Sequence, residues 1–154
     1  MWGCPDCVTR NDRQVLMFAP QGMAADGYAS RNLYQSGCGV GHWLPGEPFA
    51  QQGAFQELDR GHDFYAPQSF LTPDGRRIVI GWLAMWESPM PEQQDGWAGM
   101  LSLPRGRSLT ADNRVQMRPA GEVEAMRQQW QGWGVNTLNN QQQPVMDHCE
   151  SAEV

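Results

Sequence analysis

The segment that decides the fold class is residues 64–84, FYAPQSFLTPDGRRIVIGWLA, in which two apolar stretches flank a turn. Pro73-Asp74-Gly75 predicts a tight reversal, because proline presets φ and glycine supplies a positive φ. The stretch that follows, 77–84, contains three consecutive β-branched residues and is the strongest strand candidate in the chain. We therefore expect residues 64–84 to form a β-hairpin.

The rest of the chain continues this pattern. Strand candidates recur about every 10–20 residues with turn signals between them, at 15–20, 33–40, 55–59, 99–103 and 115–117. The frequent Gly (17), Pro (11) and Trp (7) residues also favour short strands over long helices. Only 120–130 shows helical apolar spacing, and Pro119 is well placed to open it. The sequence therefore predicts an all-β fold, a propeller or a sandwich, with one short helix.

Charge and hydropathy exclude several classes of partner. The net charge is −6, from 17 acidic and 11 basic residues, and every basic residue is Arg. The Arg residues form no basic stripe, so we expect no nucleic acid and no anionic membrane as partners. No apolar run reaches the ~18 residues that span a bilayer, and no signal-peptide pattern opens the chain, so we expect a cytoplasmic protein.

Cys4-Pro5-Asp6-Cys7 fits a CxxC motif at the beginning of the chain. A redox pair normally precedes a helix, and no helical pattern follows here. A structural zinc site needs two further ligands, which Cys38 and His42 could supply. We favour a third interpretation, two half-buried thiols in a strand, and expect no metal and no cofactor.

Two segments have the composition of a sugar-binding pocket. Residues 59–68 combine carboxylates, a His, a Tyr and a Gln, the mixture that a polyhydroxylated ligand requires beside an aromatic face. On composition alone, a polar turn explains them better. Trp82 and Trp86 share a face of an extended segment, where they could stack on a sugar ring or pack in a core.

Longer blocks of the sequence resemble a known family. WGCPD, RNLYQSG, ELDRGHDFYAPQSF, GRRIVIGWLAMWESPMPEQ, GWAGMLSLPR and QMRPAGEVEAMR occur in the order found in glycoside hydrolase family 32, and are most similar to its bacterial sucrose-6-phosphate hydrolases, a type of invertase (β-fructofuranosidase). The resemblance implies a five-bladed β-propeller followed by a β-sandwich. It also implies a retaining mechanism, with nucleophile and acid/base carboxyls about 5–5.5 Å apart. The family places these groups in Asn-Asp-Pro and Glu-Cys-Pro motifs, and a stabilising Asp in Arg-Asp-Pro.

The chain departs from this family pattern at each acidic motif. It contains neither Asp motif, and Gly3 stands where the acid/base Glu belongs, before the matching Cys4 and Pro5. The resemblance implies that 1–118 are about the last two blades, and 119–154 a helical linker and the start of the sandwich. Asp63, Tyr65 and Trp82 would face the sugar.

These departures lead to a functional expectation. We expect a β-fructofuranosidase fragment that is inactive alone, binds a fructoside weakly, and pairs with itself or with a complementing chain. The alternative is a non-catalytic carbohydrate-binding or interaction module.

Overall fold

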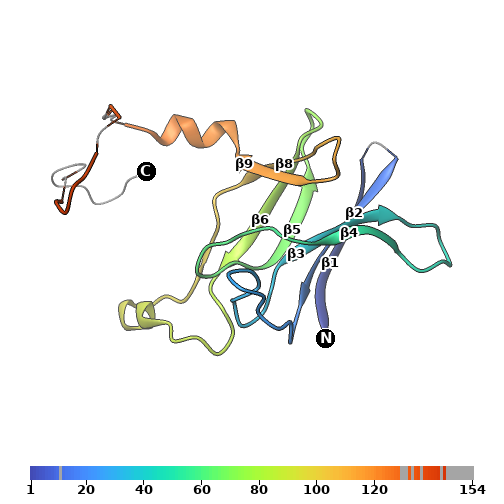
Figure 1. Ribbon diagram of the computed structural model, residues 1–154, viewed down its shortest axis with the longest axis horizontal. Helices are drawn as coiled ribbons and strands as arrows, with labels where there is room; N and C mark the ends of the chain where they lie inside the picture. Colours follow the sequence, from blue (N-terminus) through green and yellow to red (C-terminus); the bar gives the residue numbers. More distant parts are fainter. Residues whose placement is uncertain (11, 129–131, 133, 136, 143, 145–154) are drawn as a thin grey trace.

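Two antiparallel sheets dominate the computed structural model (Figure 1). It describes residues 1–154 except 11, 129–131, 133, 136, 143 and 145–154. The first sheet has the order β1-β2-β3-β4, from Trp2–Arg10, Arg13–Pro20, Gly37–His42 and Ala50–Glu57. The second has the order β5-β6-β8-β9, from Tyr65–Leu71, Arg77–Leu83, Arg105–Leu109 and Val115–Pro119, and the short β7, Met100–Leu101, pairs with β6. The all-β prediction is confirmed, and each sheet is an antiparallel meander, with β7 as a fifth strand in the second.

The predicted strands differ from the observed ones where local signals conflict. The segments at 15–20, 55–59, 64–71, 77–84, 99–103 and 115–117 all overlap strands, but the one at 33–40 begins only at Gly37. The strand expected to hold Cys4 and Cys7 is β1, whereas β8 was not predicted, because Arg-Gly-Arg opens it. Instead of a helix over 120–130, the structure has a 3₁₀ helix, η2, at Gly121–Met126, and part of the predicted segment lies outside the described residues. A second 3₁₀ helix, η1, spans Pro91–Asp95. Within the described ranges, no helix is long and apolar enough to cross a membrane.

The predicted turn joins β5 to β6 and is held by its own side chains. Gly75 has a φ of 83°, and its N–H donates to the Thr72 carbonyl at 2.9 Å. The Asp74 carboxylate accepts from the Arg76 Nε at 2.7 Å. Arg76 also donates through both terminal nitrogens to Glu122 of η2, at 2.9 and 2.6 Å. The turn therefore anchors the segment that follows β9.

The turn between β8 and β9 repeats this arrangement. Residues 110–114, Thr-Ala-Asp-Asn-Arg, match 72–76, Thr-Pro-Asp-Gly-Arg. Asn113 takes the positive φ, at 60°, and its N–H donates to the Thr110 carbonyl at 3.1 Å. Arg114 Nε donates to Asp112 at 2.7 Å, as Arg76 does to its own aspartate. Thr-x-Asp-(Gly/Asn)-Arg is thus a repeated hairpin turn that the sequence analysis did not detect.

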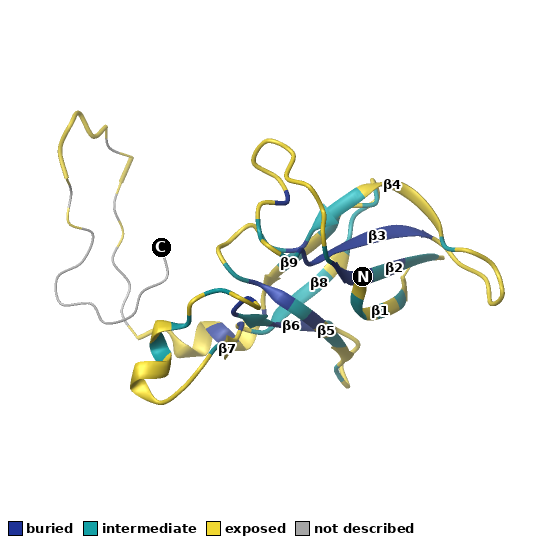
Figure 2. Ribbon diagram, turned by 90° about the horizontal axis from the view of Figure 1, so that it is seen from below, coloured by how far each residue is buried: buried dark blue, intermediate teal, exposed yellow. Residues whose placement is uncertain are grey.

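The main core lies between the two sheets. Its buried members are Val15, Met17, Cys38, Val40, Leu58, Phe64 and Val79. β3 is buried along nearly all of its length (Figure 2). The Phe64 ring rests on Gly81, where a Cβ would lie 2.4 Å from the ring, and the Arg105 guanidinium covers it at 4.7 Å from the ring centre. The ring is therefore enclosed between a strand backbone and a cation.

β1 and β5, the first strands of the two sheets, each contain a bulge of the same kind. Each has a residue at positive φ directly before a proline, Cys4 at 50° and Ala66 at 49°, and its pairing register shifts there. The strands are also joined through side chains. Asp6 accepts from the Ser69 N–H at 2.9 Å and from its hydroxyl, and Gln68 Nε2 lies 3.4 Å from the Cys4 carbonyl oxygen. Such strained positions cost about 1–3 kcal/mol each and concentrate at functional sites.

Candidate functional site

Gly3 lies at the start of β1, beside the second sheet. A Cβ at this position would be 3.9 Å from the Ala19 carbonyl oxygen and 3.9 Å from the Tyr65 hydroxyl. Both are ordinary van der Waals distances, and Gly3 is not among the glycines with positive φ. A larger residue therefore fits here, and its side chain would begin next to the Tyr65 hydroxyl.

Tyr65 of β5 and Trp82 of β6 lie opposite each other on the two paired strands. Their Cα atoms are register partners. Tyr65 is only 5% exposed and packs with Ala19 and Met85 in a small second core, against which Trp82 is half-buried. The Gln21 side-chain amide donates to the Tyr65 hydroxyl at 3.3 Å. The structure thus brings three positions chosen from the sequence, 3, 65 and 82, into one region.

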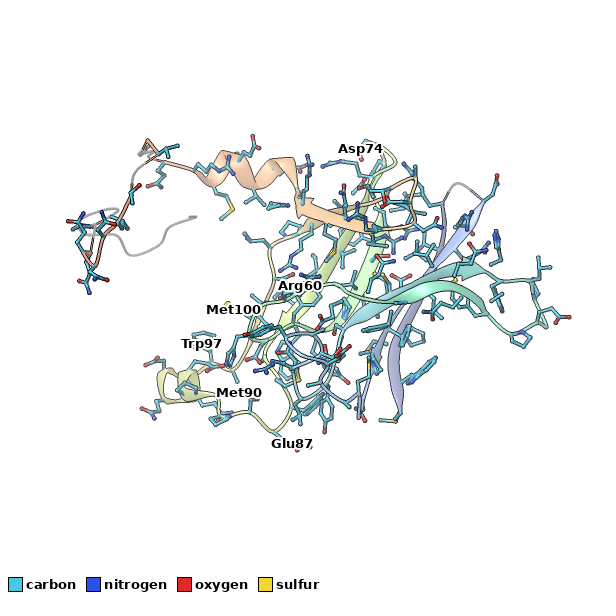
Figure 3. The ribbon with its side chains drawn as sticks, viewed as in Figure 1. Arg60, Asp74, Glu87, Met90, Trp97 and Met100 are labelled. Atoms are coloured by element: carbon cyan, nitrogen blue, oxygen red, sulfur yellow. The ribbon has the colours of Figure 1, made fainter. Side chains whose placement is uncertain are left out.

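A hydrogen bond between two loops borders this region. The Tyr34 ring lies 5.8 Å from that of Tyr65, and the Tyr34 hydroxyl donates to Glu87 at 2.8 Å. This bond raises the pKa of Tyr34, because it stabilises the protonated phenol beside a carboxylate. In Figure 3, Glu87 lies at the same end of the molecule as Met90, opposite the Asp74 turn.

The two tryptophans of the second predicted cluster are in contact. The rings of Trp82 and Trp86 meet edge to face, with centres 5.6 Å apart. Gly99 has a φ of 64°, and a Cβ there would lie 2.3 Å from the indole nitrogen of Trp82. Trp82 is therefore held between a second tryptophan and a close backbone, which positions it firmly while part of its surface stays open.

The polar segment 59–68 does not act as one cluster. Asp59 pairs with Arg105 at 2.6 Å, and the Gln68 side-chain amide donates to the backbone carbonyls of Cys4 and Pro67. The Asp63 side chain is 28% exposed, 3.4 Å from His62 Nδ1, and two residues from Tyr65. Only Asp63 and Tyr65 of this segment remain candidates for ligand contact.

A cavity of about 500 Å³ lies elsewhere in the structure. It is lined by Glu57, Leu58, Asp59, Leu83, Ser102, Leu103, Arg105, Val115, Met117 and Pro119. None of the four positions chosen from the sequence lines it. We therefore assign this cavity to the packing between the sheets and not to the candidate site.

The cysteines do not form the zinc site considered above. Cys4 is half-buried and Cys7 exposed, both in β1, while Cys38 is buried in β3, where burial raises its pKa to about 11. In the part of the chain that the structure describes, no three His, Cys, Asp or Glu side chains gather to hold a metal ion.

Sequence reasoning missed Gln21, Tyr34 and Glu87. Tyr34 stands in a block quoted for the family resemblance, and Glu87 directly follows Trp86, so both carried a weak signal. Gln21 had none, because its contact with Tyr65 joins residues 44 positions apart.

Comparison with known proteins identifies the family. Residues 1–119 match the glycosyl hydrolases family 32 N-terminal domain. The chain belongs to this family. Over all 154 residues it is 54% identical to a sucrose-6-phosphate hydrolase of Escherichia coli, and over 131 residues it is 52% identical to a raffinose invertase of Escherichia coli.

Solved structures of family 32 agree with this fold. A β-fructofuranosidase from Bombyx mori superposes with a TM-score of 0.76 at 37% identity, covering 83% of this chain and 27% of its own. A sucrose-6-phosphate hydrolase from Lactobacillus gasseri gives 0.71 at 26% identity, covering 82% of this chain and 26% of its own. The chain also spans only 32% of the first Escherichia coli relative.

Proposed function

We propose that this chain is the acid/base-bearing part of a family 32 β-fructofuranosidase, with glycine in place of the acid/base residue. The two meanders, within 1–118, would be about the last two blades of its five-bladed propeller. Residues 119–154 would be a linker and the start of the sandwich. The bonds between Arg76 and Glu122 would hold the start of this linker against the last propeller sheet.

The closeness of position 3 to the Tyr65 hydroxyl carries the proposal. A side chain grown from Gly3 would begin 3.9 Å from the hydroxyl of Tyr65, the register partner of Trp82. This is the geometry of a pocket wall that presents a proton donor, a hydroxyl and an aromatic face to one sugar ring. Asp63, Tyr65 and Trp82 are accordingly proposed to contact the fructosyl unit of sucrose or sucrose 6-phosphate.

The same geometry explains why the 154-residue chain should not hydrolyse a fructoside. Retaining cleavage needs a carboxylate that attacks the anomeric carbon and an acid that protonates the leaving oxygen. Gly3 has no side chain to donate that proton, and neither Asp motif occurs in these 154 residues. Loss of general acid catalysis alone lowers the rate by about 10²–10⁴-fold.

A chimera tests this proposal. The segment of the Escherichia coli sucrose-6-phosphate hydrolase that precedes the matched region would be joined to this chain, since the family pattern places both aspartates there. We expect the Gly3 chimera to be nearly inactive on sucrose and its phosphate, and Gly3→Glu to raise kcat by about 10²–10⁴-fold.

Gly3→Gln is the matched control, because it fills the same space but its amide cannot act as a general acid, and it should stay inactive. A nitrophenyl fructoside separates chemistry from folding, since nitrophenolate leaves without protonation. The Gly3 chimera should release a burst of nitrophenolate and then stall.

A folded Gly3→Glu chimera with no gain on sucrose would contradict the assignment of position 3. Tight fructoside binding by the 154-residue chain would instead favour the carbohydrate-binding module.

We further propose a cytoplasmic location. Cys4, Cys7 and Cys38 are free thiols, as is usual in a reducing compartment.

A further inference from the structure

Two arginines lie side by side at the edge of the main core. Arg77 of β6 and Arg107 of β8 are register partners, and such cross-strand partners point to the same face of a sheet. Val79, two positions after Arg77, is buried in the main core. Leu109, two positions after Arg107, packs against the same core. Because side chains alternate along a strand, both guanidinium groups lie on the face that is turned toward the first sheet.

Neither guanidinium forms an ion pair with a carboxylate among the residues that the structure describes. In the same part of the chain, the Nε of Arg77 and the Nη1 of Arg107 are buried without a hydrogen-bond partner. Arg105, on the same face of β8, shows the usual arrangement, since it pairs with Asp59 at 2.6 Å. Like charges opposite each other destabilise a sheet, and a buried charge is costly unless it is paired. The two arginines therefore lack the negative charge that would balance them.

The other titratable groups around the pair do not supply that charge. Asp6 is the carboxylate whose charge acts on Arg107, and it already accepts from the Ser69 N–H at 2.9 Å and from the Ser69 hydroxyl. Burial lowers the pKa of Arg107, and the charge of Arg77 lowers it further, although Asp6 acts in the opposite direction. The two neighbouring thiols of β1 and β3 stay neutral at pH 7, because burial raises the pKa of each. Two positive charges therefore face one negative charge.

The free donors of this arginine pair suit a tetrahedral oxyanion. A guanidinium is a planar fork that binds phosphate through paired, charge-assisted hydrogen bonds. A phosphate group carries more than one negative charge at pH 7 and has several acceptor oxygens, so it can accept from both side chains at once. We propose that Arg77 and Arg107 together bind one phosphate group, either inorganic phosphate or the phosphate of a sugar phosphate.

This phosphate site is separate from the candidate sugar pocket. Arg77 precedes Trp82 on β6 by a distance of about 16 Å along the extended strand. It also follows the Asp74 turn, which Figure 3 places at the end of the molecule opposite Glu87. A phosphate held by both arginines would join β6 to β8, which share only three register pairs. The bound ion would therefore stabilise the second sheet without taking part in fructoside cleavage.

Thermal unfolding and isothermal titration calorimetry with phosphate test this proposal. Inorganic phosphate at about ten times its Kd should raise the melting temperature by about 3–6 °C relative to sodium chloride of equal ionic strength. Arg77→Gln and Arg107→Gln should each weaken phosphate binding by about tenfold or more. Neither should lower the melting temperature in chloride, because each removes one of two adjacent like charges. Arg118→Gln is the matched control: Arg118 is exposed on the neighbouring β9, and its replacement should leave the phosphate response intact.

A conservative variant and a second ligand complete the experiment. Arg107→Lys keeps the charge but loses the planar fork, so it should melt like the unmodified chain in chloride and bind phosphate more weakly. Glucose 6-phosphate distinguishes the two sources: a response equal to that of inorganic phosphate indicates a sugar phosphate, and a smaller one a free ion. An unmodified chain that melts at the same temperature in phosphate and in chloride would overturn the proposal. So would glutamine variants that keep the phosphate shift, which is the result expected of arginines with a purely structural role.

Discussion

Replacing Gly81 by alanine should destabilise the fold through a single contact. The new Cβ would lie 2.4, 2.6 and 3.0 Å from three ring atoms of Phe64, distances that real Cβ atoms hardly ever show. The ring cannot swing away easily, because it is buried in the main core and Arg105 covers it. Overpacking of this kind costs about 1–3 kcal/mol, against a gain of about 0.4–1 kcal/mol from restricting the unfolded chain.

We therefore expect Gly81→Ala to lower the free energy of unfolding by about 1–2 kcal/mol. Its melting temperature should fall by about 2–8 °C. Urea denaturation followed by tryptophan fluorescence measures the change. Gly106→Ala is a matched control on a neighbouring strand, since its Cβ would meet only the Arg118 carbonyl oxygen, at 3.9 Å. Equal effects of the two substitutions would refute the reasoning. The double variant Gly81→Ala, Phe64→Leu should lose less stability than the sum of the singles.

Three further substitutions test charged contacts. Asp59→Asn leaves Arg105 without its carboxylate partner at 2.6 Å, in a pair whose side chains are only 16% and 23% exposed, and should cost about 1–3 kcal/mol in urea denaturation. Asp112→Asn, in an exposed pair, should cost less than about 1 kcal/mol, and equal costs would argue against burial as the cause. Hydrogen bonds from Arg76 lower the pKa of Glu122 from its ordinary 4.5 to about 2, so this contact stabilises the fold above pH 4.5 and fades as the pH falls toward 2. Glu122→Gln should flatten the dependence of the urea midpoint on pH across that range, and an unchanged slope would contradict the assignment.

The predictable parts of the fold are those whose signals are local. Pro73, Asp74 and Gly75 encode their turn within a few residues, so the hairpin around it was confirmed. The bulge in β1 could not be predicted, because the partners of the strand around Pro5, Ser69 and Gln68, come from the other sheet. Residues 120–130 have helical spacing, yet their described part, up to residue 128, forms a 3₁₀ helix, whose contacts include the charged bond to Arg76.

The candidate site shows the same limit. Tyr65 and Trp82 were named from the family resemblance, and the structure places them as register partners. The bond between Tyr34 and Glu87 joins residues 53 positions apart, from two loops whose course depends on both sheets. No spacing in the sequence could have revealed it, because tertiary packing alone brings these loops together.

The repeated turns also bear on the order in which the chain folds. Each Thr-x-Asp-(Gly/Asn)-Arg turn closes a hairpin with contacts only a few residues apart, and such hairpins form within about 1–10 μs. β6 and β8, by contrast, are joined through residues 84–104 and share only three register pairs, including Arg77 with Arg107. Closing this longer loop carries a larger entropic cost. We therefore expect the second sheet to assemble from two early hairpins that join last along the seam between β6 and β8, and the native sheet to open first along the same seam.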